Sequence, residues 1–255
     1  MKIKYKFFTL LALLLIIGIE AEPFDSTYIA KPSATSLLKN ANIYDGEGNE
    51  FLGYDLLIKN GKIEAIGSDL DTQTEDAIEY DLSGMWVTPG IIDLHSHMGV
   101  YSAPGVKSSS DGNESTSPVT ADVWAEHSVW TQDPQFSLAL QGGVTTFHVL
   151  PGSANLIGGR GTTFKNIQSN TVQGMKYPDA PHSLKMACGE NPKRVYGSRR
   201  QAPSTRMGNV AGYRKAWIKA SKYKQNMNSY ESKSAEAKEI VSPPTRDLEM
   251  DTLAG

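Results

Sequence analysis

The alternation of apolar and polar positions between residues 37 and 88 predicts a small sheet of short antiparallel strands. The apolar runs DLLIKN and KIEAIG flank the pair Asn60-Gly61, and Asn-Gly between such runs is typical of a tight hairpin turn. A second turn is expected at GEGN, residues 46–49. A sheet this small buries little apolar surface by itself, so we expect it to pack against another part of the protein.

The pattern changes after Pro89-Gly90. IIDLH (91–95) and VTTFHVL (144–150) are continuous apolar runs, which indicate strands buried on both faces of a parallel sheet. A third apolar run, SLKMA, covers residues 183–187. The glycine-rich stretch PGSANLIGGRG (151–161) is expected to be a loop.

Helices are predicted between and after these strands. Asp133-Pro134 favours a helix start, and that helix should stop at Gly142-Gly143, which gives an α/β order of elements. Beyond Met207 the spacing predicts a long helix. Its buried face is expected to carry the following residues: Val210, Tyr213, Trp217, Ala220 and Tyr223.

Composition narrows the class of protein. The chain has 255 residues, 39% of them hydrophobic, and a formal net charge of −3, which suits a medium-sized globular protein. This mild, mixed charge gives no indication of nucleic-acid binding. Cys188 is the one cysteine, so the sequence excludes an intrachain disulfide and a zinc site built from cysteine pairs.

The first residues have the character of a targeting segment. Three lysines precede an apolar run from Phe7 to Ile19, and a polar stretch follows. This order predicts a signal peptide at residues 1–21 and a polar lead-in at 22–36. We therefore expect a secreted or periplasmic protein. It would be attached to a membrane only if the segment stayed uncleaved, although the run is shorter than the ~20 residues of a comfortable span.

Two of the five histidines, His95 and His97, stand one residue apart at the end of the 91–95 run. In a strand, side chains at positions i and i+2 point to the same face, about 7 Å apart. Two imidazoles placed in this way can converge on one metal ion, and zinc accepts that geometry readily. The carboxyl end of a buried strand is also where α/β folds place their active sites. The sequence therefore predicts a metal site here.

The residues around this pair resemble a known family. PGIIDLHSHMG is similar to the first barrel strand of the amidohydrolase superfamily, whose pattern is PGxIDxHxH. NANIYDGEG and DLLIKNGKIEAIG resemble the N-terminal part of that family's small β-sandwich. GGVTTFHVLPGSANLIGGRG and LKMACGENPKRVYG are similar to its imidazolonepropionase-like or prolidase-like branch.

The resemblance implies a fold and its extent. It predicts part of a β-sandwich at 37–88 and, at 89–255, the N-terminal part of a (β/α)8 TIM-type barrel, in which three or four strands can be recognised. The family's later metal histidines and its catalytic Asp have no counterpart, so that Asp is expected beyond the chain end. We therefore expect a truncated fragment that is inactive by itself and whose catalytic residue is unknown.

The resemblance also implies a site. His95 and His97 correspond to metal ligands for one or two divalent ions, commonly zinc. Asp93 can support His95 or be structural. A bridging ligand is expected from Glu190 or from a carboxylated Lys185. The remaining alternative is that both residues are structural.

His148, which ends the 144–150 run, is either near the substrate or a packed histidine. His127 and His182 are expected in loops at the surface.

The implied reaction is hydrolysis of an amide, lactam or imide C–N bond by metal-activated water, with a small amide or a dipeptide as substrate. The alternative is a non-catalytic extracytoplasmic protein that uses the same scaffold for binding.

Overall fold

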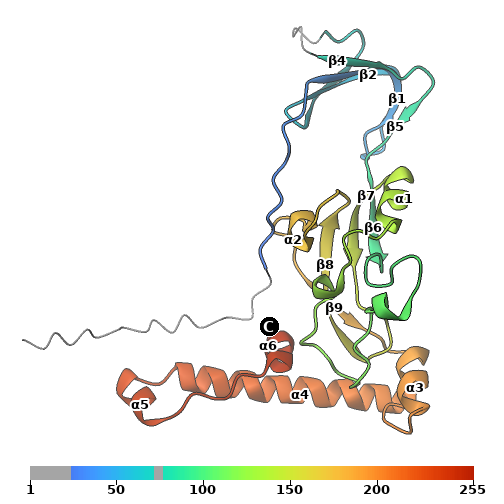
Figure 1. The fold of residues 1–255 in the computed structure, drawn as a ribbon. Coiled ribbons are helices and arrows are strands. Elements are labelled where there is room, and N and C mark those ends of the chain that lie inside the picture. Colours follow the sequence, from blue (N-terminus) through green and yellow to red (C-terminus); the bar gives the residue numbers. More distant parts are fainter. Residues whose placement is uncertain (1–23, 72–76) are drawn as a thin grey trace, which may run out of the picture.

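A computed structural model describes residues 24–71 and 77–255. The predicted signal peptide, residues 1–21, lies outside the described residues. The described chain forms a mixed α/β structure with two separate sheets, one above the other in Figure 1. The expectation of an α/β protein is confirmed.

The first sheet contains five strands: β1 (Ser36–Tyr44), β2 (Glu50–Lys59), β3 (Lys62–Gly67), β4 (Ile78–Asp81) and β5 (Trp86–Val87). Their order is β3-β2-β1-β4, and β5 pairs with β1. β4 and β5 are parallel to β1, so the sheet is mixed and not antiparallel throughout as predicted. β2 and β3 form the hairpin predicted at Asn60-Gly61, with Lys59 opposite Lys62. Ala41, Ile43 and Leu56 form its small core.

The second sheet contains four strands: β6 (Ile91–Ser96), β7 (Val144–Val149), β8 (Ile157–Lys165) and β9 (Ser183–Met186). β6 and β7 are parallel, whereas β8 is antiparallel to both β7 and β9. The sheet order is β6-β7-β8-β9, so β6 and β9 are its two edges. β6, β7 and β9 therefore run in the same direction, and the reversed strand β8 separates β7 from β9.

Two predictions about this sheet are wrong. Residues 157–161 form the first half of β8, not a loop. The glycines there allow another segment to approach closely, because a Cβ at Gly159 would lie 2.2 Å from the Val123 carbonyl oxygen. β6 is an edge strand and is not buried on both faces. Ile92 and Leu94 are 60% and 75% exposed.

The helices lie around the second sheet: α1 (Gln135–Gln141), α2 (Val172–Met175), α3 (Glu190–Gly197), α4 (Arg206–Glu231), α5 (Ala235–Ile240) and α6 (Leu248–Ala254), with short 3-10 turns η1 (Lys107–Ser109) and η2 (Ala125–Ser128). The predicted α1 is confirmed. Pro134 is its N-cap residue, and the Asp133 carboxylate accepts a hydrogen bond from the backbone N–H of Gln135. None of the described helices combines the length and the apolar character needed to cross a membrane.

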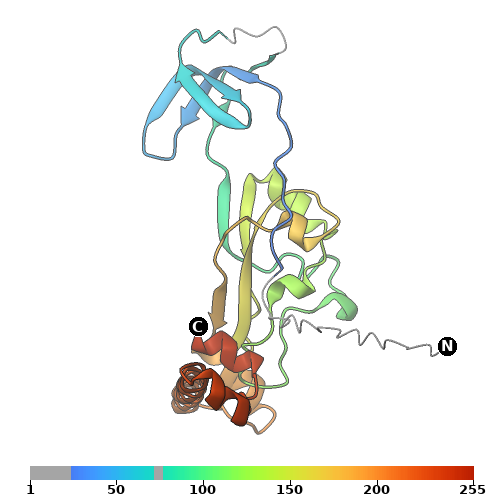
Figure 2. The same cartoon turned by 90° about the vertical axis from the view of Figure 1, so that its left-hand side faces the viewer.

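Two apolar clusters hold α1, α2, α4 and α6 to the sheet. One contains Phe136 of α1, Phe147 of β7 and Phe164 of β8. The other joins Leu156 and Ile157 to Ala216 and Ala220 of α4. Figures 1 and 2 show α4 crossing the end of the sheet with α6 beside it.

The long helix was predicted, but its predicted buried face is only partly right. Ala216 and Ala220 are buried, and Tyr213 and Tyr223 pack against them. Val210 and Trp217 instead remain 57% and 41% exposed.

A short N-terminal segment lies against the second sheet before the chain crosses to the first. Lys176 Nζ donates to the carbonyl of Phe24, and Ser26 Oγ donates to the carbonyl of Lys176, both over 2.7 Å. Residues 29–35 then run to β1, as the blue trace in Figure 1 shows. The two sheets are therefore connected both by residues 29–35 and by residues 88–90.

Candidate active site

The histidine pair lies at the carboxyl end of β6. The rings of His95 and His97 are 5.2 Å apart between centroids and nearly perpendicular. This proximity follows from the strand itself, because the two side chains leave the backbone on the same face. The two imidazoles are thus brought together as the sequence predicts.

One nitrogen of the His97 ring is fixed by the backbone. Nδ1 lies 2.9 Å from the carbonyl oxygen of Leu150, which can only accept a hydrogen bond. We therefore assign the proton to Nδ1, which leaves Nε2 with a free lone pair. Histidine ligands of metals are oriented by this kind of hydrogen bond.

Tyr101 supports His97 from another side. Its ring lies edge-on to the His97 ring, with centroids 5.6 Å apart. Its backbone N–H donates to the His97 carbonyl in the turn that follows β6. Asn113 Nδ2 donates to the Tyr101 hydroxyl, and Asn113 Oδ1 accepts from the N–H of Ala154. The loops after β6 and β7 are therefore tied together beside His97.

His95 faces a lysine from the far edge of the sheet. Lys185 Nζ of β9 lies 3.2 Å from His95 Nε2. The positive charge of Lys185, followed by burial, lowers the pKa of His95. Burial also lowers the pKa of Lys185. The backbone N–H of His95 donates to the Asp93 carboxylate over 3.0 Å, so Asp93 supports the end of β6.

Glu190, the other candidate for a bridging ligand, lies elsewhere. It is the first residue of α3, its side chain is 67% exposed, and its carboxylate pairs with Arg194 at 2.9 Å. The structure therefore brings Lys185, and not Glu190, to the histidine pair.

His148 lies on β7 with both ring nitrogens engaged. Nδ1 is 2.8 Å from Thr163 Oγ1, and Nε2 is 2.6 Å from Ser183 Oγ. Burial lowers the pKa of His148, and nearby His182 adds to the effect. A neutral imidazole has one donor and one acceptor, which matches two hydroxyl partners.

The other two histidines are outside this group. His127 is exposed, as predicted, and stacks on Trp124. His182 is half-buried, contrary to prediction, because it bonds to Thr162 and to the Gly161 carbonyl.

Several residues of the site carry little or no signal in the sequence. Tyr101 carries a weak signal, since it follows His97 by one turn. The carbonyl of Leu150 and the hydroxyl of Ser183 carry none, because their roles depend on strand pairing.

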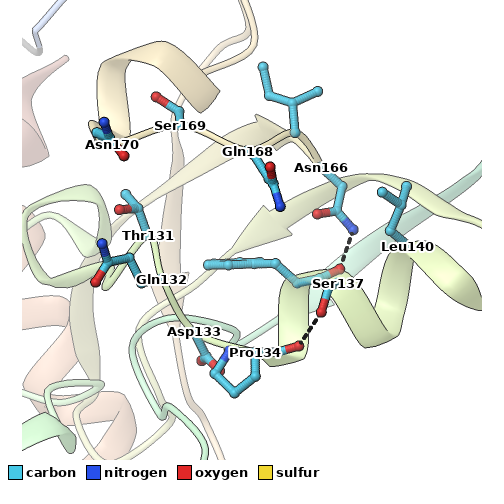
Figure 3. A pocket seen from close by; sticks show the side chains of 12 residues that line it. Thr131, Gln132, Asp133, Pro134, Ser137, Leu140, Asn166, Gln168, Ser169 and Asn170 are labelled. Atoms are coloured by element: carbon cyan, nitrogen blue, oxygen red, sulfur yellow. Dashed lines mark hydrogen bonds between the residues drawn. The ribbon is translucent and has the colours of Figure 1, made fainter.

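A cavity of about 540 Å³ lies at the other end of β7, beside α1 (Figure 3). Amide and hydroxyl side chains dominate its lining, including Gln132, Gln168 and Asn170. The one carboxylate there, Asp133, accepts hydrogen bonds from the backbone N–H groups of Gly99 and Gln135. The cavity therefore has no free acid or base and is not the candidate catalytic centre.

The chain has relatives among known proteins. No protein-family model matches the chain. The chain is 32% identical over 234 residues to the amidohydrolase tasK of Hapsidospora irregularis, covering 82% of this chain and 24% of that protein. It is 30% identical over 117 residues to an imidazolonepropionase of Chromobacterium violaceum, covering 39% of this chain and 28% of that protein.

A solved structure shares the fold over most of the chain. The amidohydrolase from Thermotoga maritima MSB8 is 40% identical with a TM-score of 0.75, and the similarity covers 85% of this chain and 54% of that one. The chain thus spans about half of the solved relative and about a quarter of the two curated ones.

These comparisons confirm the resemblance found in the sequence. The homologues are amidohydrolases, hydrolases that act on C–N bonds, and the chain is related to the amidohydrolase superfamily over part of their length. The curved second sheet with its helices corresponds to a half-barrel. Proteins of this superfamily generally depend on a divalent metal.

Proposed function

We propose that this protein is a metal-dependent amidohydrolase, and that His95, His97 and Lys185 form part of its metal centre. The substrate class is a small amide, lactam, cyclic imide or dipeptide. The proposal includes the finer fold assignment, in which 37–88 is part of a β-sandwich and 89–255 is the first part of a (β/α)8 barrel.

The observation that supports this most is the hydrogen bond from His97 Nδ1 to the Leu150 carbonyl. It fixes the ring with Nε2 available as a ligand, next to a second imidazole whose centroid is 5.2 Å away. A histidine that only packs in a core is expected to hydrogen-bond through both nitrogens, and not to present an unbonded nitrogen beside another histidine. The donor set therefore fits a divalent cation of borderline softness such as zinc.

Lys185 is the proposed source of a further metal ligand. The described residues hold no group of three or more His, Cys, Asp or Glu side chains that could bind a metal. Lys185 is the side chain of another type that lies beside the histidine pair. Burial favours the neutral amine of Lys185. A neutral amine can add to CO2 with release of one proton, and the resulting carbamate would supply an oxygen ligand beside His95.

When bound, the cation would lower the pKa of a coordinated water to about 7 and polarise the scissile carbonyl. The chain's own residues orient these ligands. Leu150 and Tyr101 hold His97, and Asp93 holds the backbone of His95. Because the described histidines and carboxylates form no complete ligand set, we expect the 255-residue chain to bind the cation without measurable amide turnover.

Calorimetric titration of the 255-residue chain with Zn²⁺ tests the proposal. We expect one or two bound ions in the unaltered chain and at least tenfold weaker binding in His95→Ala and His97→Ala. His182→Ala, which removes a histidine outside the pair, is the matched control. Equal binding by the unaltered chain and His97→Ala would contradict the metal assignment.

We also propose that the protein is exported and that residues 1–21 are removed. N-terminal sequencing of protein recovered outside the cytoplasm tests this, with a new terminus expected at Glu22. Recovery of protein that begins at Met1 would contradict it.

A further inference from the structure

A side chain bridges two strands that are not neighbours. β8 lies between β7 and β9, so no backbone hydrogen bonds join β7 to β9. The ring of His148 on β7 nevertheless reaches Ser183 Oγ on β9 at 2.6 Å. Its other nitrogen bonds to Thr163 on β8, so one imidazole contacts all three strands.

The absence of a side chain at Gly161 makes this bridge possible. Gly161 of β8 lies opposite Ser183 in the strand pairing. A Cβ built there would be 2.8 Å from His148 Nε2 and 2.7 Å from Ser183 Oγ. Both are closer than real Cβ contacts, so the ring crosses β8 where that strand has no side chain.

The position of β9 decides whether Lys185 reaches His95. β9 has four residues, and its backbone pairs with β8 alone among the described strands. Ser183 precedes Lys185 by two residues, so their side chains leave β9 on the same face. A bond that holds Ser183 therefore also fixes the base of Lys185.

The end of β7 and the residue that follows it orient the opposite side of the site. Two residues after His148, the Leu150 carbonyl accepts from His97. Residues 148–150 thus contact both halves of the ligand group, His97 from β6 and the strand of Lys185.

We propose that His148 is a positioning residue that, through Ser183, holds Lys185 against His95 and so prearranges the metal centre. This inference rests on the proposed function. It assigns His148 neither to the metal nor to the substrate, because both of its nitrogens are used by hydroxyl groups.

The test is Co²⁺ binding by the whole chain. Calorimetry measures the affinity, and the visible absorption spectrum reports the surroundings of the bound ion. Ser183→Ala removes the partner hydroxyl with little change in volume, and His148→Phe removes both hydrogen bonds. We expect each variant to bind Co²⁺ about 10- to 100-fold more weakly, with an altered spectrum. Ser183→Thr, which keeps a hydroxyl, should recover affinity and spectrum.

Two further variants separate positioning from general destabilisation. Asn166→Ala breaks two hydrogen bonds at the other end of β7, to the carbonyls of Phe136 and Val144, and should lower stability while keeping the Co²⁺ affinity and spectrum. The double variant His148→Phe/Ser183→Ala should bind Co²⁺ as tightly as His148→Phe does. Both substitutions break the same hydrogen bond between His148 and Ser183, so their effects do not add.

The outcomes separate this inference from the proposed function. If the unaltered chain binds Co²⁺ and both Ser183→Ala and His148→Phe bind it equally well, the positioning role is overturned while the metal centre stands. If the unaltered chain binds no Co²⁺, the proposed function fails and this inference with it.

Discussion

Lys185 Nζ lies 3.2 Å from His95 Nε2, although the two residues are 90 positions apart and stand on opposite edge strands of the second sheet. A flat sheet would keep these edges three strand spacings apart, roughly 14 Å. The curvature that goes with a half-barrel lets side chains from both edges meet over the concave face of the sheet. This curvature creates the candidate site.

Replacing Lys185 should change the titration of His95. The positive lysine is the largest influence that lowers the pKa of His95. In Lys185→Met we therefore expect the pKa of His95 to rise in metal-free protein, as measured by NMR of the histidine rings over pH. The control is Lys165→Met, which removes a lysine of β8 that lies over the Tyr177 ring. An unchanged His95 titration in Lys185→Met would show that the two groups do not meet in solution.

Replacing Glu190 should have little effect on metal binding. Its carboxylate pairs with Arg194 on the exposed side of α3. We expect Glu190→Ala to keep the Zn²⁺ affinity of the unaltered chain and to change the free energy of unfolding by at most about 0.5 kcal/mol. Calorimetry and urea denaturation measure the two quantities. A tenfold loss of Zn²⁺ affinity would restore Glu190 as a ligand.

The fold should lose stability in mild acid. The pKa values of His148 and His182 are lowered from 6.5, chiefly by burial. Below pH 6.5 the unfolded chain therefore binds more protons at these sites than the folded one. Stability from these sites is complete above that pH and falls as the pH drops through it, by at most about 1.4 kcal/mol per pH unit and histidine.

Urea denaturation between pH 7.5 and 5 would measure this loss. The double variant His148→Gln/His182→Gln should show a shallower pH dependence, whereas His127→Gln, at an exposed position, should follow the unaltered chain. An identical slope in all three proteins would rule out the two histidines as its source.

The buried ion pair between Glu126 and Lys176 should matter for folding. The charged atoms are 2.7 Å apart, and both side chains are almost completely buried. Glu126→Ala leaves the lysine charge without its carboxylate, which we expect to lower the free energy of unfolding by about 3–5 kcal/mol. Glu231→Ala, which breaks an exposed pair with Lys238, should cost less than about 1 kcal/mol. Equal effects in denaturant titrations would show that the Glu126 pair is not buried in solution.

Local chemistry made part of the fold predictable from sequence. The hairpin at Asn60-Gly61 follows from the turn preference of two adjacent residues. The closeness of His95 and His97 follows from the period of a strand. Neither requires knowledge of distant parts of the chain.

The remaining features depend on contacts that no local pattern encodes. The sequence predicts a loop for residues 157–161 of β8 because their glycines disfavour a strand, yet Gly159 is needed where the Val123 carbonyl approaches. The meeting of Lys185 and His95 depends on sheet curvature, and therefore the sequence left Glu190 and Lys185 as alternatives. The face of α4 was misjudged at Trp217 because apolar character does not reveal which side meets the sheet.

The clasp between Lys176 and the Phe24 carbonyl has a mechanical consequence. With Phe24 and Ser26 held beside α2, the first sheet is joined to the second by two backbone connections rather than one. A single connection would allow the first sheet to rotate in any direction. Two connections restrict it to rotation about the line that joins them. Breaking the hydrogen bond between Lys176 and the Phe24 carbonyl would therefore increase the mobility of the first sheet without breaking any bond inside that sheet.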